Sequence, residues 1–139
     1  QLIGASGAPY DWVAAGDPRT YDDMVTPEGL KEVARYADGI GVDTRRVLPV
    51  GPDGATTEPT TLVRDAHRHR LDVHVWTVRN ENSQLPADHR RGNPDNPVYP
   101  RATGDVAGFL DRMLELGIDG AFCDDPGLGR AVVAGRARL

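Results

Sequence analysis

The sequence of 139 residues has little of several residue types, and each shortage limits what the protein can be. Cys123 is the one cysteine, so no disulfide can form within the chain and the redox compartment is left open. Lys31 is the one lysine, the net charge is −5 and no basic stripe is visible, which argues against nucleic acid as a partner. No apolar run reaches the roughly 18 residues of a membrane-spanning helix. An ordinary globular domain is the expected class.

Motifs of the familiar catalytic and nucleotide-binding sites are also missing. The chain has no P-loop, no Gly-x-Gly-x-x-Gly, no Gly-x-Ser-x-Gly and no Cys-x-x-Cys. His67 and His69 are two residues apart on a predicted helix, where a shared metal would need a spacing of about four. His74 lies on a predicted strand and His89 in a loop. We therefore assign no catalytic and no metal-ligating residue within the chain.

What the sequence does contain is an alternation of short apolar strands with amphipathic helices. The clearest helix carries Val106, Phe109, Leu110 and Met113 on one stripe, with Gly117 where a C-terminal cap belongs. Strands and helices that alternate in this way predict parallel βα units. The predicted strands lie near residues 1–5, 40–42, 72–78 and 118–123, and the predicted helices at 27–37, 61–70, 106–116 and 128–138.

Three segments rich in Gly, Pro or polar residues are expected to be loops. Residues 10–25 read as a long surface excursion, and residues 43–59 as a second loop. Residues 81–104 form a third, which is much longer than most connections between helices and strands. A loop of that length is more often functional than a plain connection.

The carboxyl ends of the strands supply the candidate site residues, because a parallel α/β barrel has its active site there. Strand alternation places His74, Trp76, Val78 and Asn80 on one face. Trp76 could then form a pocket wall and Asn80 could donate to a ligand oxygen, while the Arg79 guanidinium suits a phosphate. The alternatives are that Trp76 is core, that Asn80 is a turn residue and that Arg79 is a surface ion-pair partner.

The last strand ends in Cys123, Asp124 and Asp125. Neighbouring residues of an extended segment point in opposite directions, so the two aspartates are poorly placed to share one ion. An Asp before Pro126 is also a common turn former. Acidic neighbours would raise the pKa of the Cys123 thiol, which favours a small core residue over a nucleophile.

Several stretches together resemble the glycerophosphodiester phosphodiesterase family. The family shows an Ala-His on its penultimate helix, a Val-x-x-Trp-Thr-Val-Asn-like strand and a Gly-Val-Asp-Gly-Ile-x-Thr-Asp-x-Pro-like final strand. The matching stretches here are residues 63–67, 71–82 and 116–126. Residues 9–11, 14–21, 25–27 and 36–41, together with 80–82 and 85–86, resemble the periplasmic or secreted branch of the family. Two departures are Cys123, where Thr is usual, and Arg79, where Asn is frequent.

The resemblance implies a TIM-like (β/α)₈ barrel that hydrolyses glycerophosphodiesters to glycerol 3-phosphate and an alcohol. It also implies two catalytic histidines and a divalent cation, Ca²⁺ or Mg²⁺, held by carboxylates. The histidines and most of the carboxylates belong to a His-Arg-Gly and a Glu-x-Asp motif of the first half of the barrel, and neither motif occurs here. Residues 89–92 (HRRG) are only superficially similar and follow the penultimate strand. Trp76 is the residue the resemblance carries over, with Arg79 second.

We therefore expect residues 1–139 to be the C-terminal half of the barrel, about strands five to eight, and to be inactive alone. A complete barrel needs about 250 residues, and the chain starts at Gln1 with no initiator Met and no signal peptide. The expected partners are the missing N-terminal half or a second copy, and a small glycerophosphodiester. The alternatives are a non-catalytic binding or interaction module, and a related phosphodiesterase with another lipid-type substrate.

Overall fold

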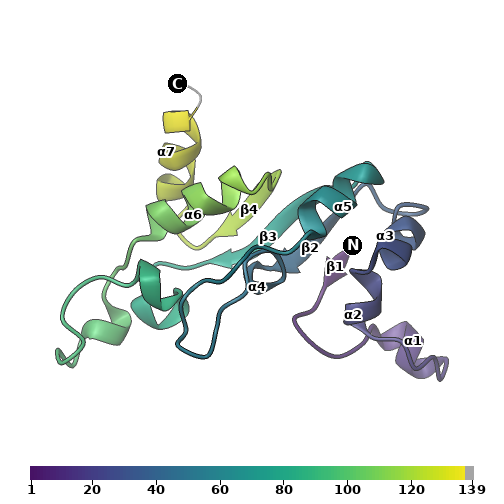
Figure 1. Ribbon diagram of the computed structural model, residues 1–139, viewed down its shortest axis with the longest axis horizontal. Helices are drawn as coiled ribbons and strands as arrows, with labels where there is room; N and C mark the ends of the chain where they lie inside the picture. The colour runs from purple at the N-terminus through teal and green to yellow at the C-terminus, as the bar shows by residue number, and fades with distance from the viewer. Residues whose placement is uncertain (137–139) are drawn as a thin grey trace.

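Four strands form one sheet in which neighbours run parallel and follow the order of the chain, β1-β2-β3-β4. The computed structural model describes residues 1–136 (Figure 1). The strands are β1 (Leu2–Ile3), β2 (Gly39–Asp43), β3 (Asp72–Val78) and β4 (Gly120–Cys123). Ile3 pairs with Val42, and Val42 with Val75, so the register runs straight across the first three strands.

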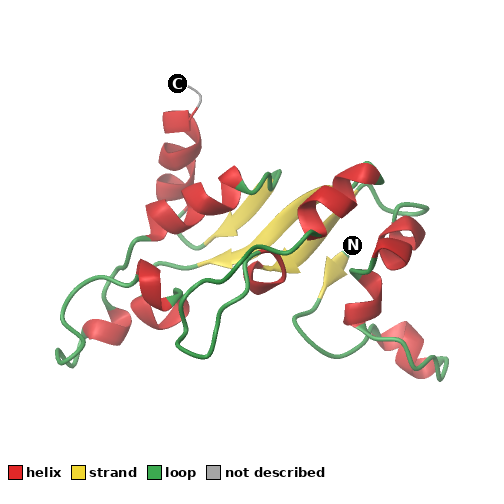
Figure 2. Cartoon of the chain, viewed as in Figure 1, coloured by secondary structure: helices red, strands yellow, loops and turns green. Residues whose placement is uncertain are grey.

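Helices connect the strands. They are α1 (Tyr10–Ala14), α2 (Tyr21–Met24), α3 (Pro27–Val33), α4 (Thr44–Val47), α5 (Leu62–Arg68), α6 (Val106–Glu115) and α7 (Pro126–Arg136), with 3₁₀ turns at Asn82–Gln84, Ala87–His89 and Tyr99–Arg101. Helix α4 packs against β2 and β3, α5 against β3, and α7 against β4 and α6. Figure 2 shows α5 and α6 along the upper side of the yellow sheet, and α1, α2 and α3 beside its β1 end. Among residues 1–136, no helix has the length and apolar character needed to cross a membrane.

Local sequence explains the start of the main helices. The Asp105 carboxylate accepts the Gly108 N–H at 3.4 Å at the start of α6, whose apolar stripe belongs to the buried core. In α3, the Thr26 hydroxyl caps the N–H of Gly29 at 3.1 Å, and Pro27 takes the first helical position. Both helices were predicted from these patterns, although α3 ends at Val33 rather than near residue 37.

The side chains on the two faces of the sheet differ in how deeply they are buried. The side chains that face the helices are at most 1% exposed, and they are Ile3, Ile40, Val42, Val73, Val75 and Val78. On the other face, Leu2 is 68% and Phe122 54% exposed. This strand order, with helices on one face, is that of four consecutive strands of a (β/α)₈ barrel. The prediction of an α/β half-barrel is thereby confirmed.

Two of the predicted loops contain helices, which corrects the sequence analysis. Residues 10–25 hold α1 and α2, and α2 starts at a capping box in which the Thr20 N–H donates to the Asp23 carboxylate at 2.6 Å. Residues 43–59 hold α4, where the Asp43 carboxylate accepts the Arg45 N–H at 2.8 Å. Helices of four or five residues have too few positions for an apolar period to show.

The predicted face of Val78 was wrong. Val78 is buried on the helix-covered face with Val75, not on the face of Trp76. Between Val75 and Val78, which pair with Ala121 and Cys123 of β4, the register shifts by one residue. Such a bulge reverses the alternation beyond it.

Other boundaries move less. Strand β4 begins at Gly120 and α7 at Pro126, two residues from the predicted starts at 118 and 128. Residues 137–138, at the end of the predicted last helix, lie outside the described residues.

Candidate functional site

The carboxyl ends of the four parallel strands lie along one edge of the sheet, and a pocket opens there on the uncovered face. The pocket has a volume of about 390 Å³. Its lining is apolar and aromatic, made of Leu2, Ile3, Gly4, Tyr21, Trp76, Thr77 and Phe122. Sequence reasoning placed Trp76 in a pocket wall, and the structure places it in this one. The sequence analysis did not name Tyr21 as a site residue, because Tyr21 lies in a segment that was predicted to be a loop.

Trp76 crosses the neighbouring strand at a glycine. A Cβ on Gly41 would stand 3.7 Å from the Trp76 ring and only 2.7 Å from a methyl group of Leu2. The bare backbone of Gly41 therefore gives both side chains room to lie across β2. The Trp76 Nε1 donor is buried and has no hydrogen-bond acceptor within residues 1–136. A buried donor of this kind is costly without a partner.

Arg79 lies at the same edge but not in the lining of the pocket. Its Nε is 3.5 Å from an Asp124 carboxylate oxygen, and the two side chains are 48% and 53% exposed. Asp125 points elsewhere, because its carboxylate caps α7 by accepting the Leu128 N–H at 3.0 Å. The two aspartates are thus separated, as the strand geometry predicted.

Asn80 lies at the base of the long loop. Its carbonyl accepts the Gly104 N–H at 2.9 Å, which closes the loop on itself. Its side-chain oxygen is buried without a donor in the described part of the chain. The side chain is outside the pocket lining, so the structure brings together Trp76 but not Arg79 and Asn80 in one cavity.

Asn82 is a residue that sequence reasoning missed. It is fully buried, accepts the Arg91 N–H at 2.9 Å and donates to the carbonyls of Arg91 and Tyr99 at 2.8 and 2.9 Å. These bonds organise residues 81–104, which are therefore an ordered structure with 3₁₀ turns. The available signal was physical: a loop this long must satisfy its backbone groups somewhere.

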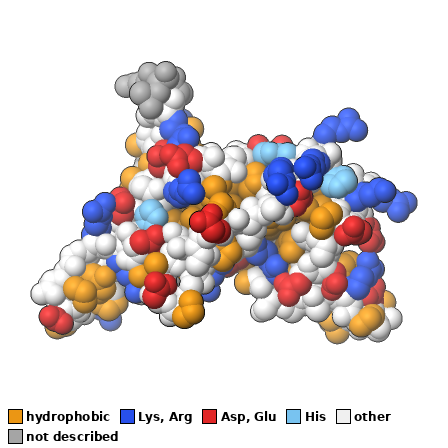
Figure 3. Space-filling model, viewed as in Figure 1, with side chains coloured by type: hydrophobic (Ala, Val, Ile, Leu, Met, Phe, Trp, Pro, Cys, Tyr) orange, Lys and Arg blue, Asp and Glu red, His pale blue; other side chains and the backbone are white. Residues whose placement is uncertain are grey.

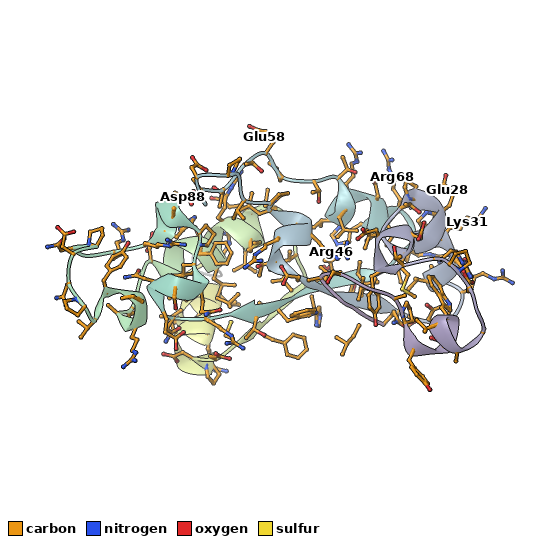
Figure 4. The ribbon with its side chains drawn as sticks, turned by 90° about the horizontal axis from the view of Figure 1, so that it is seen from below. Glu28, Lys31, Arg46, Glu58, Arg68 and Asp88 are labelled. Carbon is orange, nitrogen blue, oxygen red and sulfur yellow. The ribbon has the colours of Figure 1, made fainter. Side chains whose placement is uncertain are left out.

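Arg46 fixes the loop that follows β1. Its guanidinium donates to the Gly4 carbonyl at 2.7 and 3.0 Å, to the Ala5 carbonyl at 3.1 Å and to the Asp22 carboxylate at 2.9 Å. The Arg46 side chain is only 12% exposed. Figure 4 shows it in the middle of the view, away from the outer ends of the molecule. It therefore ties β1 and α2, which both border the pocket, to α4.

Neither the thiol nor the histidines assemble a reactive centre. Burial raises the pKa of the Cys123 thiol, and Asp124 and Asp125 raise it further, so it is a poor nucleophile. Within residues 1–136 no three His, Cys, Asp or Glu side chains gather as metal ligands. His67 instead lies at the opposite end of the strands, with Nε2 2.8 Å from an Asp119 oxygen.

The face seen in Figure 3 carries positive and negative side chains side by side, without a continuous basic stripe. On this face, the mixture of charges matches the sequence, in which no basic stripe was found. The site is thus an aromatic pocket with an arginine and two aspartates along the same edge.

Comparison with known proteins identifies the family. Residues 5–128 match the Glycerophosphoryl diester phosphodiesterase family. A glycerophosphodiester phosphodiesterase of Arabidopsis thaliana is 34% identical over 109 residues, and one of Haemophilus influenzae is 28% identical over 113. Each alignment covers 78% of this chain, which spans about a quarter (26%) of the length of these relatives.

Among solved structures, a protein of Silicibacter pomeroyi described as a glycerophosphoryl diester phosphodiesterase superposes with a TM-score of 0.47 at 20% identity. That match covers 91% of this chain and 34% of the other. The family match spans most of the sequence, including β2, β3 and β4. This chain belongs to the glycerophosphoryl diester phosphodiesterase family.

Proposed function

We propose that the protein to which this chain belongs hydrolyses glycerophosphodiesters to glycerol 3-phosphate and an alcohol. The observation that carries the proposal is the family match over residues 5–128. The names of the curated relatives give the same activity. The chain has the architecture of half a barrel, so we assign it the C-terminal half of the catalytic domain.

In this proposal residues 1–139 supply substrate-binding groups. Trp76 forms a wall that keeps water from the bound diester, and the Arg79 guanidinium pairs with phosphoryl oxygens. Asn80 offers an amide to a ligand oxygen. The half-exposure of Arg79 and its long 3.5 Å contact with Asp124 support this role, since such a pair costs little to open.

The acid, the base and the metal site are proposed to come from residues outside this chain. Family members generally depend on a divalent metal, which would neutralise charge on the phosphoryl group. The residues described here do not fit such a site, because no three potential ligands gather among residues 1–136. The Ca²⁺ or Mg²⁺ ligands are therefore assigned to the other half of the barrel.

The same half is the proposed partner of the open sheet face. Leu2 and Phe122 are more than half exposed there, and β1 and β4 each have one edge without a described strand beside it. Apolar surface and free strand edges of this kind need cover. A second copy of the chain is the alternative cover. By resemblance to the secreted branch, we also propose a periplasmic or extracellular location.

The test separates the whole protein from the half. The coding sequence upstream of Gln1 should encode a His-Arg-Gly and a Glu-x-Asp motif, and the protein with both halves should release glycerol 3-phosphate from glycerophosphocholine. Residues 1–139 alone should release none. Hydrolysis by residues 1–139 that a chelator abolishes would overturn the assignment of the catalytic groups to the other half.

A non-catalytic binding module is the second candidate, favoured by the lack of a cluster of metal ligands among the described residues. It predicts that the upstream sequence lacks both motifs and that substrate binds without turnover. Isothermal titration of glycerophosphocholine, run beside the hydrolysis assay, distinguishes the two.

A further inference from the structure

A small polar cavity lies on the helix-covered side of the sheet, where the segments that follow β2 and β3 meet. We propose that this cavity binds a phosphate-sized dianion, at a site separate from the candidate site beside Trp76. Its polar side chains are those of Thr44, Arg45, Ser83, Gln84 and Arg90. The inference does not depend on the proposed function, because it concerns binding at another place in the fold.

The charge of the lining favours an anion. Arg45 and Arg90 are its two charged residues and no carboxylate belongs to it, although the chain as a whole has a net charge of −5. Within residues 1–136, neither guanidinium forms an ion pair with a carboxylate. A guanidinium presents N–H donors in a geometry that suits phosphate oxygens, so two of them in one lining can neutralise a dianion.

Arg45 differs from its neighbour Arg46 in how its side chain is used. The Arg46 guanidinium is bonded within the fold, to the Gly4 carbonyl and the Asp22 carboxylate among others. Arg45 is exposed, and among the described residues only its backbone N–H is bonded, to the Asp43 carboxylate at 2.8 Å. The Arg45 guanidinium is therefore available to a ligand, whereas that of Arg46 is not.

The floor of the cavity is apolar. Leu48, Leu85 and Phe109 belong to the lining and are at most 4% exposed. Arg90 is fixed beside this floor, because its Nε donates to the Leu85 carbonyl at 3.0 Å, and its Nη groups have no acceptor within residues 1–136. Apolar surroundings lower the local dielectric constant, which strengthens the attraction between a guanidinium and an anion.

The two segments that form the cavity are held together without a ligand. The Ala87 N–H donates to the Gly54 carbonyl at 2.8 Å, and the Thr56 N–H donates to the Asp88 carboxylate at 3.1 Å. The Thr56 hydroxyl donates to the same carboxylate. A site that is ordered in advance loses little freedom when a ligand binds.

The size of the cavity limits the ligand. Its volume is about 100 Å³. Sites for drug-sized molecules have roughly 300–1,000 Å³. A phosphate group fits a cavity of this size, whereas a whole glycerophosphodiester does not.

The cavity is also separate from the proposed contact with the rest of the barrel. That contact lies on the open face and at the outer edges of β1 and β4. Helix α4, which supplies Thr44 and Arg45, packs instead against β2 and β3, the two inner strands of the sheet. The site should therefore bind its ligand whether or not the other half is present.

The experiment is an NMR titration of isotope-labelled residues 1–139 with inorganic phosphate at constant ionic strength. The amide signals of Arg45, Gly54, Ser83 and Leu85 should shift and saturate. Arg45→Met and Arg90→Met should each weaken the binding about five- to tenfold, since each removes a charged donor. No saturable shift at these amides, or unchanged affinity in both variants, would overturn the site.

Two control variants test where the phosphate binds. Arg35→Met removes the same charge at an exposed position outside the lining and should change the affinity by less than about twofold. Arg79→Met removes the arginine of the candidate site and should leave the shifts around the cavity as they are. A loss in Arg35→Met as large as that in Arg45→Met would overturn the site in favour of general charge attraction.

Further arms identify the source of the phosphate and protect the test against misfolding. Methyl phosphate, a small monoester, should bind as tightly as inorganic phosphate if the site takes the end of an ester, and more weakly if it takes free phosphate. Circular dichroism shows whether each variant folds, and Arg45→Met decides if Arg90→Met does not. If residues 1–139 aggregate, the same titration of the protein with both halves gives the answer.

Discussion

The two faces of the sheet have different tasks. On the helix-covered face, Ile40, Val73 and Val75 are almost fully buried, and the packing there is that of an ordinary domain core. On the other face, Leu2 and Phe122 are exposed and a pocket opens beside Trp76. The first face carries the buried core of the chain, while the second leaves large apolar side chains exposed.

Because only one face of the sheet is buried, mutations that affect stability and mutations that affect function should fall on different faces. In a (β/α)₈ barrel the inward face becomes a second core once the strands close. Here that face is both the proposed contact with the rest of the barrel and the location of the candidate site. Mutations on it should therefore change assembly and binding more than the stability of the isolated chain.

The largest effect on stability is expected from removing a buried side chain on the helix-covered face. Ile40→Ala removes a side chain that is 1% exposed, and it should lower the free energy of unfolding by about 2–5 kcal/mol through lost burial and the cavity left behind. Leu2→Ala, at a position 68% exposed, is the matched control and should change it by less than about 0.5 kcal/mol. Urea denaturation measures both. Equal losses would mean that the open face is covered in solution.

A second effect concerns the amino ends of the strands. Asp119 accepts the Val73 N–H at 2.7 Å and contacts His67, so Asp119→Ala should cost about 1–3 kcal/mol by leaving the Val73 donor unpaired. Burial raises the Asp119 pKa, but these hydrogen bonds outweigh it and hold the pKa below its ordinary 3.8.

The sign of the pH effect follows. The ionised Asp119 stabilises the fold above pH 3.8, and this stability is lost as the pH falls through the depressed pKa. The free energy of unfolding of the wild type should therefore drop in that range more steeply than that of Asp119→Ala. If the free energy of unfolding fell equally with pH in the wild type and in Asp119→Ala, the hydrogen bonds of Asp119 would not be the cause of the pH effect.

A smaller effect on stability, with a clear effect on assembly, is expected at Phe122. Phe122→Ser should change the unfolding free energy of the isolated chain by no more than about 0.5 kcal/mol, since the ring is 54% exposed. It should reduce any self-association, because it removes apolar surface from the open face. Sedimentation velocity over a concentration series measures this. If Phe122→Ser self-associated as strongly as the wild type, the contact between copies would lie on another surface.

The smallest effect is expected from Asp124→Asn. The exposed pair with Arg79 should contribute at most about 0.5 kcal/mol to stability. If Arg79 binds phosphate, release from Asp124 should leave or improve the affinity for glycerol 3-phosphate, whereas Arg79→Met should weaken it. Calorimetric titration of both variants provides the test, and equal affinities would remove Arg79 from the site.

Much of the architecture could be predicted because its signals are local. The apolar stripe of α6 and the β-branched run of β3 each fit within a single element, and their alternation indicated parallel strands. The position of Trp76 near the end of β3 followed from the same reasoning. The short helix α2 was not predicted, because its signal is one capping box and not an apolar periodicity.

What could not be predicted depends on contacts between distant segments. The face of Val78 is set by a bulge that arises only when β4 pairs with β3. Tyr21 reaches the pocket because Gly4, 17 positions away in sequence, leaves space for its ring. No pattern within either segment contains that information.

The hydrogen bonds of Asn82 have a consequence for how this protein can diversify. They close the long loop onto backbone atoms of Arg91 and Tyr99, which any residue except proline at position 91 would supply. Gly92 has a φ of +99°, which favours glycine, but the stretch 93–98 that follows it is exposed throughout. Its sequence, and to a degree its length, can therefore drift or accept an insertion while the anchored base stays in place, which makes it the natural position for a graft or an affinity tag.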